Sequence, residues 1–193
     1  MHAGFIGHAA HSGIAPEEGR SAIVACARAI VDFRLGRIDE ETTANVGVVR
    51  GGVARNIVPG LCELEAEIRS HNEKKQLELI EEMLVTITFA AEQSECRAET
   101  KLIEIYRGYK FKPGELPVVL ARKALESCGF KPKLALTGGG ADANIFNAGG
   151  LPCVNLSNGM AHIHSPEEEI AVDDLVRMVD VTLALVDAAR AND

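Results

Sequence analysis

The chain has 193 residues, of which 47% are hydrophobic and 25% are charged, and it carries a formal net charge of −8. This length and composition are typical of one average globular domain or two small ones, and they exclude a disordered chain. Lys and Arg form no cluster, which argues against a nucleic acid or an anionic membrane as a partner. No apolar run approaches the ~20 residues that span a bilayer, so no membrane segment is expected.

The five cysteines are odd in number, widely scattered and free of any Cys-x-x-Cys pair. This usage is typical of reduced thiols in a reducing compartment. We interpret them as small core residues rather than catalytic thiolates, because none lies beside a His or in a glycine-rich turn. Residues 1–13 contain no Lys or Arg and therefore lack the charged start of a secretory signal. A cytoplasmic location is expected.

The first half of the chain alternates between strand-like and helix-like patterns. Period-two alternation marks the strands, and apolar residues at helical spacing mark the helices. In chain order we expect a strand at 2–7, a helix at 20–33, strands at 42–49 and 61–68, a helix from 72 and a strand at 97–106. This order is that of the ferredoxin-like (βαββαβ) sandwich. We therefore expect an α+β domain of this kind at residues 1–110.

The second half, residues 111–193, has a different pattern. We expect a helix at 116–128, short apolar strands at 133–136 and 153–156, a short helix near Ala143 and a terminal helix from Asp173, capped by Asp173 and Asp174. Helices that alternate with short apolar strands are typical of a parallel α/β layer. So short a layer would leave its sheet faces uncovered. We therefore expect an incomplete α/β lobe that depends on missing sheet or on associated strands.

A glycine-rich segment precedes the short helix expected near Ala143. Gly138, Gly139 and Gly140 stand just before that helix, where exposed backbone N–H groups favour an anion or a developing oxyanion. A tight strand-to-helix turn is an equally good interpretation. The spacing is not that of a nucleotide-binding loop.

Histidines occur in pairs in two loops. His162 and His164 are two residues apart, so in an extended segment both would point the same way, as zinc ligands could. A second pair lies in the glycine-bounded loop 7–13. For both pairs a solvated loop is the simpler interpretation on chemistry alone. The same holds for Asn45 and Arg69 as edge residues, although Arg69 could hold a carboxylate through a two-pronged contact.

Several motifs stand in a fixed order along nearly the whole chain. The first half carries Ala10-His11-Ser12-Gly13, Asn45-Val46-Gly47, Asn56-Ile57-Val58-Pro59 and Glu67-Ile68-Arg69. The second half carries Thr137-Gly138-Gly139-Gly140-Ala141-Asp142-Ala143 and Gly159-x-x-x-x-His164. Together they resemble the metallopeptidase family of tripeptidase T, carboxypeptidase G and the aminoacylases, and most closely its tripeptidase T-like branch. The first set resembles the family's lid, or dimerisation, domain, and the second its last catalytic segment.

The resemblance implies roles for individual residues. His11 matches the lid histidine that polarises the scissile carbonyl, often in a neighbouring subunit, and is the expected catalytic residue. His164, rather than His162, matches the C-terminal metal ligand. Arg69 matches the arginine that holds the substrate carboxylate. The expected substrate-binding residues are Asn45, Arg69, Gly139, Gly140 and Asp142.

The resemblance implies a metal-dependent exopeptidase or amidohydrolase that hydrolyses short peptides or acylated amino acids with two divalent metals, expected to be zinc. The family's bridging Asp, His-x-Asp pair and Glu-Glu pair precede the lid and are not found in this chain. We therefore expect the chain to be inactive and metal-free by itself. As partners we expect a second copy bound through the lid, or a missing N-terminal half.

Two alternatives stay open. One is a non-catalytic dimerising or amino-acid-binding module derived from such a peptidase, which predicts binding that is unaltered by His164→Ala. The other is a ferredoxin-like regulatory domain with an anion-binding tail. It predicts loss of ligand binding on Arg69→Ala, with no effect of changes at Gly139 or Gly140.

Overall fold

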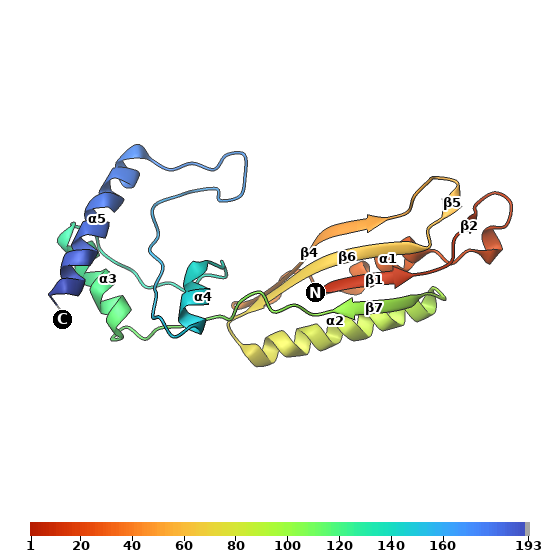
Figure 1. Ribbon diagram of the computed structural model, residues 1–193, viewed down its shortest axis with the longest axis horizontal. Helices are drawn as coiled ribbons and strands as arrows, with labels where there is room; N and C mark the ends of the chain where they lie inside the picture. The colour runs from red at the N-terminus through yellow and green to blue at the C-terminus, as the bar shows by residue number, and fades with distance from the viewer. Residues whose placement is uncertain (192–193) are drawn as a thin grey trace. The chain divides into compact units, whose positions relative to one another are not determined.

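The computed structural model describes residues 1–191 and divides into two compact units, Met1–Ile105 and a second that begins at Tyr106 (Figure 1). The first unit mixes strands and helices. Its elements are β1 (His2–Ile6), β2 (Ala10–His11), η1 (Pro16–Glu18), α1 (Ala22–Asp32), β3 (Gly36–Arg37), β4 (Thr42–Gly51), β5 (Ile57–Val58), β6 (Leu61–Ser70), α2 (Glu73–Gln93) and β7 (Arg97–Lys101). No helix within residues 1–191 is both long and apolar enough to cross a bilayer.

An antiparallel five-stranded sheet with the order β3-β4-β6-β1-β7 forms the centre of the first unit. The strand β7 ends at Lys101, earlier than the sequence pattern predicted, because its partner β1 offers only His2–Ile6 for pairing. The short strand β3 pairs with β4 only at Thr43 and Ala44. The remainder of β4, residues 45–51, is therefore an edge of the sheet within the described part of the chain.

Side-chain caps fix where the two helices of the first unit begin. The Ser21 hydroxyl accepts a hydrogen bond from the Val24 N–H at the start of α1, and the Asn72 carboxamide accepts one from the Lys75 N–H at the start of α2. Each cap satisfies a backbone donor that has no partner within the helix. Asn72 marks the start of the second helix where the sequence pattern placed it.

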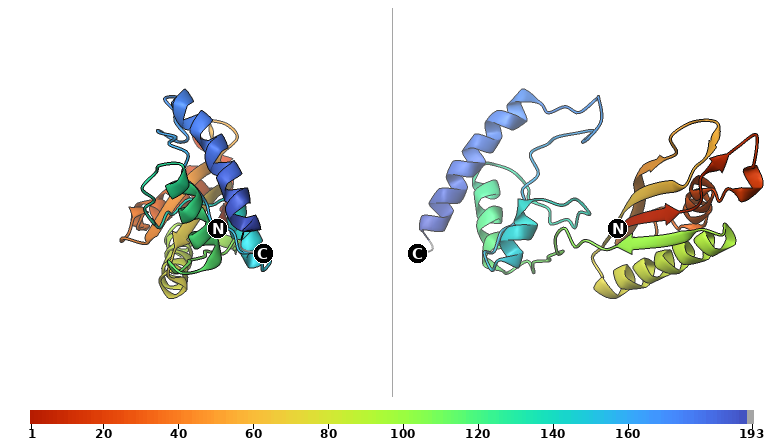
Figure 2. Two further views of the ribbon diagram at one scale, coloured as in Figure 1. Left: turned by 90° about the vertical axis from the view of Figure 1, so that its left-hand side faces the viewer. Right: turned by 45° about the vertical axis from the view of Figure 1, so that its right-hand side comes forward.

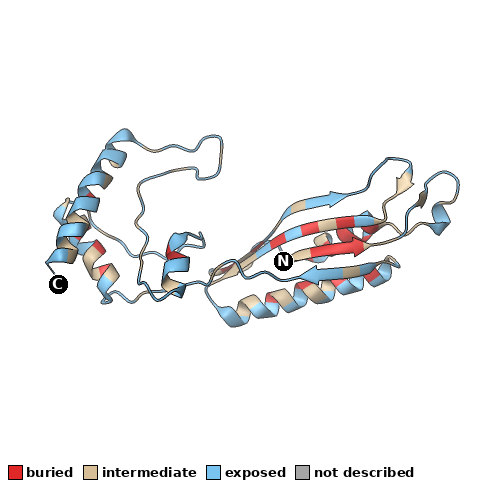
Figure 3. Ribbon diagram, viewed as in Figure 1, coloured by how far each residue is buried: buried red, intermediate tan, exposed pale blue. Residues whose placement is uncertain are grey.

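The core of the first unit lies between one face of the sheet and the two helices. Along β6, Cys62, Leu64 and Ala66 are buried, and buried positions alternate with more exposed ones along the strand (Figure 3). The glutamates between them therefore belong to the other face of the sheet. The largest fully buried side chains include Phe5, Leu64, Leu79, Met83 and Ile87. The opposite face of the sheet carries charged side chains that no helix of this unit covers.

The second unit contains three helices, α3 (Leu116–Ser127), α4 (Asp142–Ala148) and α5 (Val172–Arg190). The helices α3 and α5 lie side by side (Figure 2) and bury Val118, Ala121, Ala124 and Val181. The N-cap of α5 is Ala171, so the prediction that Asp173 and Asp174 cap this helix was wrong. They lie in its first turn, where carboxylates interact favourably with the helix dipole.

The prediction of strands at 133–136 and 153–156 was also wrong, because neither segment is a strand in the structure. A strand needs a neighbour to receive its backbone hydrogen bonds, and the described residues of this unit provide none at these segments. Leu134 and Leu136 are more than half exposed. The described residues of the second unit thus form a helical unit and not the expected parallel layer.

Candidate functional site

Arg69 lies near the end of β6 on the face of the sheet that points away from the helices. Its guanidinium forms a two-pronged ion pair with Glu67, in which Nε donates to Oε1 and Nη2 donates to Oε2, each at 2.7 Å. Residues two apart on a strand point to the same face, which allows this contact. The Arg69 side chain is 33% exposed and that of Glu67 is 48% exposed, so both charges stay partly in contact with solvent.

Asn45 lies beside this ion pair on the neighbouring strand. In the antiparallel register of β4 and β6, Thr43 is opposite Arg69 and Asn45 is opposite Glu67. Residues that face each other in this way point to the same side of the sheet, with Cβ atoms about 5 Å apart. The structure therefore brings two predicted substrate-binding residues, Asn45 and Arg69, into one patch. We call Thr43, Asn45, Glu67 and Arg69 the carboxylate patch.

A glycine lies next to the patch on β4. A Cβ atom at Gly47 would stand 3.6 Å from Nδ2 of Asn45, so the Asn45 carboxamide extends along the strand over Gly47. The register between β4 and β6 shifts between Val46 and Val48, which makes this a β-bulge. Register shifts of this kind commonly re-aim neighbouring side chains, and Asn45 lies next to this one.

His11 lies on the two-residue strand β2, which pairs with β5. Its Nδ1 atom accepts a hydrogen bond from the Gly13 N–H at 3.2 Å. An accepting Nδ1 carries no proton, so in the neutral ring Nε2 carries the hydrogen and is the donor. The exposed His11 can thus offer one N–H to a ligand oxygen.

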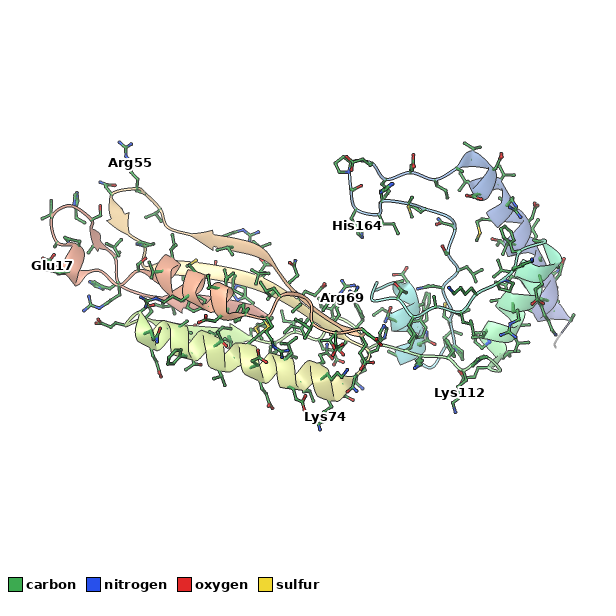
Figure 4. All side chains as sticks on the ribbon, turned by 180° about the vertical axis from the view of Figure 1, so that it is seen from behind. Glu17, Arg55, Arg69, Lys74, Lys112 and His164 are labelled. Atoms are coloured by element: carbon green, nitrogen blue, oxygen red, sulfur yellow. The ribbon has the colours of Figure 1, made fainter. Side chains whose placement is uncertain are left out.

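His11 and Arg69 lie at opposite ends of the first unit. The strands β2 and β5 lie at the end that Glu17 and Arg55 mark, whereas Arg69 lies at the other end (Figures 1 and 4). The strand β6 begins next to the first end and runs ten residues to the second, which is a length of ~30 Å. One chain therefore cannot place His11 and Arg69 on the same small substrate through this unit.

The glycine-rich loop of the second unit packs against Tyr106. A Cβ atom at Gly140 would overlap the Tyr106 ring, so only glycine fits there. The Gly139 N–H donates to the Thr137 hydroxyl at 3.2 Å. Asp142 is the first residue of α4 and is exposed. The loop that holds three of the predicted substrate-binding residues is therefore fixed by local contacts.

Asn144 anchors this loop and was missed by the sequence analysis. Its side chain is buried, donates through Nδ2 to the Arg107 carbonyl at 2.8 Å, and accepts from the Ala141 N–H at 3.0 Å. A capping box has Ser or Thr at the N-cap. The N-cap here is Ala141, so no residue pattern indicates this role of Asn144.

His162 and His164 lie in a tight loop that an isolated bridge between Ala161 and Glu169 closes. Both histidines have positive φ angles, 53° for His162 and 67° for His164, so the segment is not extended and the alternation that would point both side chains the same way does not apply. The Ser165 N–H donates to the His162 carbonyl at 3.0 Å, which turns the chain. Left-handed residues other than glycine are uncommon and concentrate at functional sites.

The His164 backbone N–H donates to Oε2 of Glu168 at 2.8 Å, and His164 lies on the loop labelled in Figure 4. Among residues 1–191, no group of three or more His, Cys, Asp or Glu side chains is placed to hold a metal ion. A zinc or similar centre takes three or four protein ligands. The described residues alone therefore do not fit a two-metal centre.

Two of the five cysteines are buried opposite each other in the core of the first unit. Burial, and then a side-chain hydrogen bond with Cys62, raises the pKa of the Cys26 thiol to about 12. Burial also raises the pKa of Cys62. Because the thiolate is the reactive form, these two thiols are inert packing groups, as the sequence interpretation predicted. Cys96, Cys128 and Cys153 are only partly buried, so the prediction that all five are core residues holds for two.

Residues 1–94 match the protein family described as "Peptidase dimerisation domain". Among curated proteins, the YqjE protein of Bacillus subtilis is 37% identical over 98% of this chain and 51% of its own length. Peptidase T of Limosilactobacillus fermentum is 35% identical over 62% of this chain and 30% of its own length. The chain thus spans about half, or less, of the length of these relatives.

Two solved structures resemble the chain along nearly all of its length. Aminopeptidase PepT of Bacillus cereus is 37% identical with a TM-score of 0.80, and the similarity covers 97% of this chain and 50% of that one. A tripeptidase of Staphylococcus aureus is 34% identical with a TM-score of 0.86, over 98% of this chain and 51% of that one. Both similarities extend over the two units described above.

Proposed function

Since the chain belongs to the peptidase family of tripeptidase T, with residues 1–94 matching its dimerisation domain, we propose that it forms the carboxylate-binding and dimerising part of an exopeptidase or related amidohydrolase. The proposed substrates are short peptides or acylated amino acids. The observation that carries this proposal is the carboxylate patch, where Arg69 and Asn45 lie together on an open face of the sheet.

The first unit is proposed to be a ferredoxin-like lid. What supports this is the order of its main elements, β1-α1-β4-β6-α2-β7, and the order β4-β6-β1-β7 of its main strands in the sheet. In this arrangement the two helices cover one face only, so the other face is available to a ligand.

Arg69 is proposed to hold the substrate carboxylate. A guanidinium presents parallel N–H groups that match the two oxygens of a carboxylate, and Arg69 already makes this type of contact with Glu67. The Asn45 carboxamide, on the adjacent strand, supplies a neutral donor and acceptor for the nearby amide of the substrate. An acyl amino acid or a peptide C-terminus presents both groups next to each other.

The proposed dimer forms through the free edge of β4. Residues 45–51 have no partner strand on their outer side within the described residues, and an exposed edge is a template for pairing with another chain. A symmetric pair of copies presents the same surface twice, so β4 would pair antiparallel with β4 of the second copy. A homodimer built in this way extends the sheet across both copies.

In antiparallel pairing, the start of β4 in one copy lies beside the finish of β4 in the other copy. Thr42, at the start of β4, lies at the Arg69 end, and Gly51, at its finish, lies at the His11 end. Pairing would therefore bring His11 of the second copy towards Arg69 of the first. The Nε2–H of His11 could then donate to the scissile carbonyl oxygen, and such donors contribute about 3 kcal/mol when the oxygen becomes negative.

His164 is proposed to contribute one ligand to a metal centre whose other ligands lie outside residues 1–191. By itself the chain is proposed to bind no metal and to hydrolyse no peptide. A cytoplasmic location stays a prediction.

Calorimetric titration of the full chain with trialanine and with trialanine amide tests the carboxylate assignment. The acid is expected to bind about tenfold more tightly than the amide, as a charge-assisted two-pronged contact allows. Arg69→Met should remove this preference. The matched control is Arg97→Met, which removes another partly paired arginine on β7. Equal binding of acid and amide by the unaltered chain would refute the assignment.

A further inference from the structure

Glu67 occupies the Nε/Nη2 fork of Arg69, one of the two forks through which a guanidinium can hold a carboxylate. Both of its oxygens accept hydrogen bonds from the guanidinium, at 2.7 Å each. A carboxylate that arrives at this fork therefore meets a carboxylate already in place. This competition between Glu67 and a substrate carboxylate rests on the proposed function, because it concerns the ligand that we assign to Arg69.

Strand geometry alone does not enforce the two-pronged contact. Arg97 and Glu99 on β7 have the same spacing of two residues, yet their closest contact is 3.5 Å and both are about 70% exposed. Arg50 reaches Glu65 through a single hydrogen bond of 2.7 Å across two strands. Among these three ion pairs of the sheet, only Glu67–Arg69 combines two short contacts with an arginine side chain that is two-thirds covered.

We propose that Glu67 is an internal competitor for the substrate carboxylate and sets the selectivity of the carboxylate patch. Ion pairs that remain partly exposed to water are weak. A peptide or acyl amino acid that gains further contacts displaces Glu67, whereas a small anion with a carboxylate alone does not. The negative charge of Glu67 also repels any anion that approaches Arg69.

A second role for Glu67, that of orienting Arg69, predicts the opposite effect of its removal. If orientation dominated, Glu67→Gln would weaken carboxylate binding, because the fork would lose its fixed direction. If competition dominates, the same change strengthens binding, because glutamine has similar size and no charge. The sign of the change therefore separates the two roles.

The test is an NMR titration of the full chain with sodium acetate, observed at the Arg69 Nε–H signal. Acetate carries a carboxylate and nothing else that could displace Glu67. Glu67→Gln should strengthen acetate binding about fivefold. This is the factor expected when the repulsion between two like charges ~4 Å apart in water is removed. Glu65→Gln is the matched control, because it removes an equal charge from the same strand and face. It should change acetate binding less than twofold.

Trialanine binding measured by calorimetry completes the design. Glu67→Gln should lower the preference for trialanine over acetate, because acetate gains more from the loss of the competitor. Unchanged or weaker acetate binding in Glu67→Gln overturns the proposal, and so does an equal gain in Glu65→Gln. The proposed function fails separately, if Arg69→Met leaves trialanine binding unaltered in both the wild-type and the Glu67→Gln background.

Discussion

His11 and Arg69, the two residues expected to contact the reacting end and the carboxylate end of a substrate, lie at opposite ends of the first unit, His11 on the two-stranded sheet β2-β5 and Arg69 on the five-stranded sheet. A strand of ten residues separates these ends, a distance far greater than the size of a tripeptide. The two residues can serve one substrate only if they come from different copies of the chain. Antiparallel pairing of two copies through the exposed edge of β4 would bring the His11 end of one copy to the Arg69 end of the other.

A lysine on the β4 edge should disrupt the dimer. Val49 is 50% exposed and lies within residues 45–51. In antiparallel pairing two copies of Val49→Lys would place like charges close to the symmetry axis, and charged edges oppose pairing. We expect the dimer dissociation constant, measured by analytical ultracentrifugation, to rise at least about tenfold, or ~1.4 kcal/mol.

The control for this change is Val53→Lys, at a residue that is 86% exposed and lies beyond the end of β4. It adds the same charge two residues beyond the end of β4 and leaves the strand edge unaltered. If Val49→Lys and Val53→Lys dimerise equally well, the dimer does not form through β4.

Replacement of Gly140 should destabilise the second unit. A Cβ atom at this position would overlap the Tyr106 ring, whereas at Gly138 it would meet no atom within 4 Å. Overpacking of this kind costs about 1–3 kcal/mol. The chain has no Trp and only two Tyr, Tyr106 and Tyr109, so tyrosine fluorescence in a urea titration reports on this unit alone. Gly140→Ala should lower the midpoint and Gly138→Ala should not; equal midpoints would contradict the packing described.

Acid should weaken the first unit through Asp39. A hydrogen bond from the backbone N–H of Glu41, and then one from Lys75, lower the pKa of Asp39 to about 2. Because its folded pKa lies below its unfolded value, the carboxylate stabilises the fold above pH ~4, and this stabilisation is lost as the pH falls towards 2.

The measurement is thermal unfolding between pH 5 and pH 2, followed by circular dichroism. Asp39→Asn should lower the melting temperature at pH 5, and its difference from the wild type should shrink towards pH 2. Glu40→Gln, one residue further along the same turn, is the control. A difference that stays constant with pH would show that Asp39 does not stabilise the fold through its charge.

Local patterns in the sequence were sufficient to predict most of the first unit. The alternation of Leu64 and Ala66 with glutamates assigns one face of β6 to the core, and Asn72 signals the start of α2. Both signals depend on neighbours in the sequence. The same logic failed at 133–136, because a strand also requires a partner from elsewhere, and an apolar run does not specify one.

The spacing of residues in the sequence does not predict the backbone angles and side-chain contacts of the candidate site. The positive φ angles of His162 and His164 follow from the hydrogen bonds of their loop and not from residue type. Spacing indicates that Glu67 and Arg69 share a face, but their two-pronged contact depends on rotamers that only the structure defines. The separation of His11 from Arg69 depends on how the strands are arranged in the first unit, which the spacing of these residues in the sequence does not specify.

The most direct test of the account is whether His11 of one copy approaches Arg69 of another. A nitroxide spin label is attached to Gly13→Cys in a chain whose partly buried Cys96, Cys128 and Cys153 are replaced by serine. This spin-labelled protein carries no isotope label and is mixed with isotope-labelled wild-type chain, so it broadens NMR signals only across the dimer. The account predicts broadening of the Arg69 Nε–H signal of the wild-type chain, with little effect on the backbone signals of its own loop 10–13. Broadening at that loop in place of Arg69, in a sample that is shown to be dimeric, would contradict it.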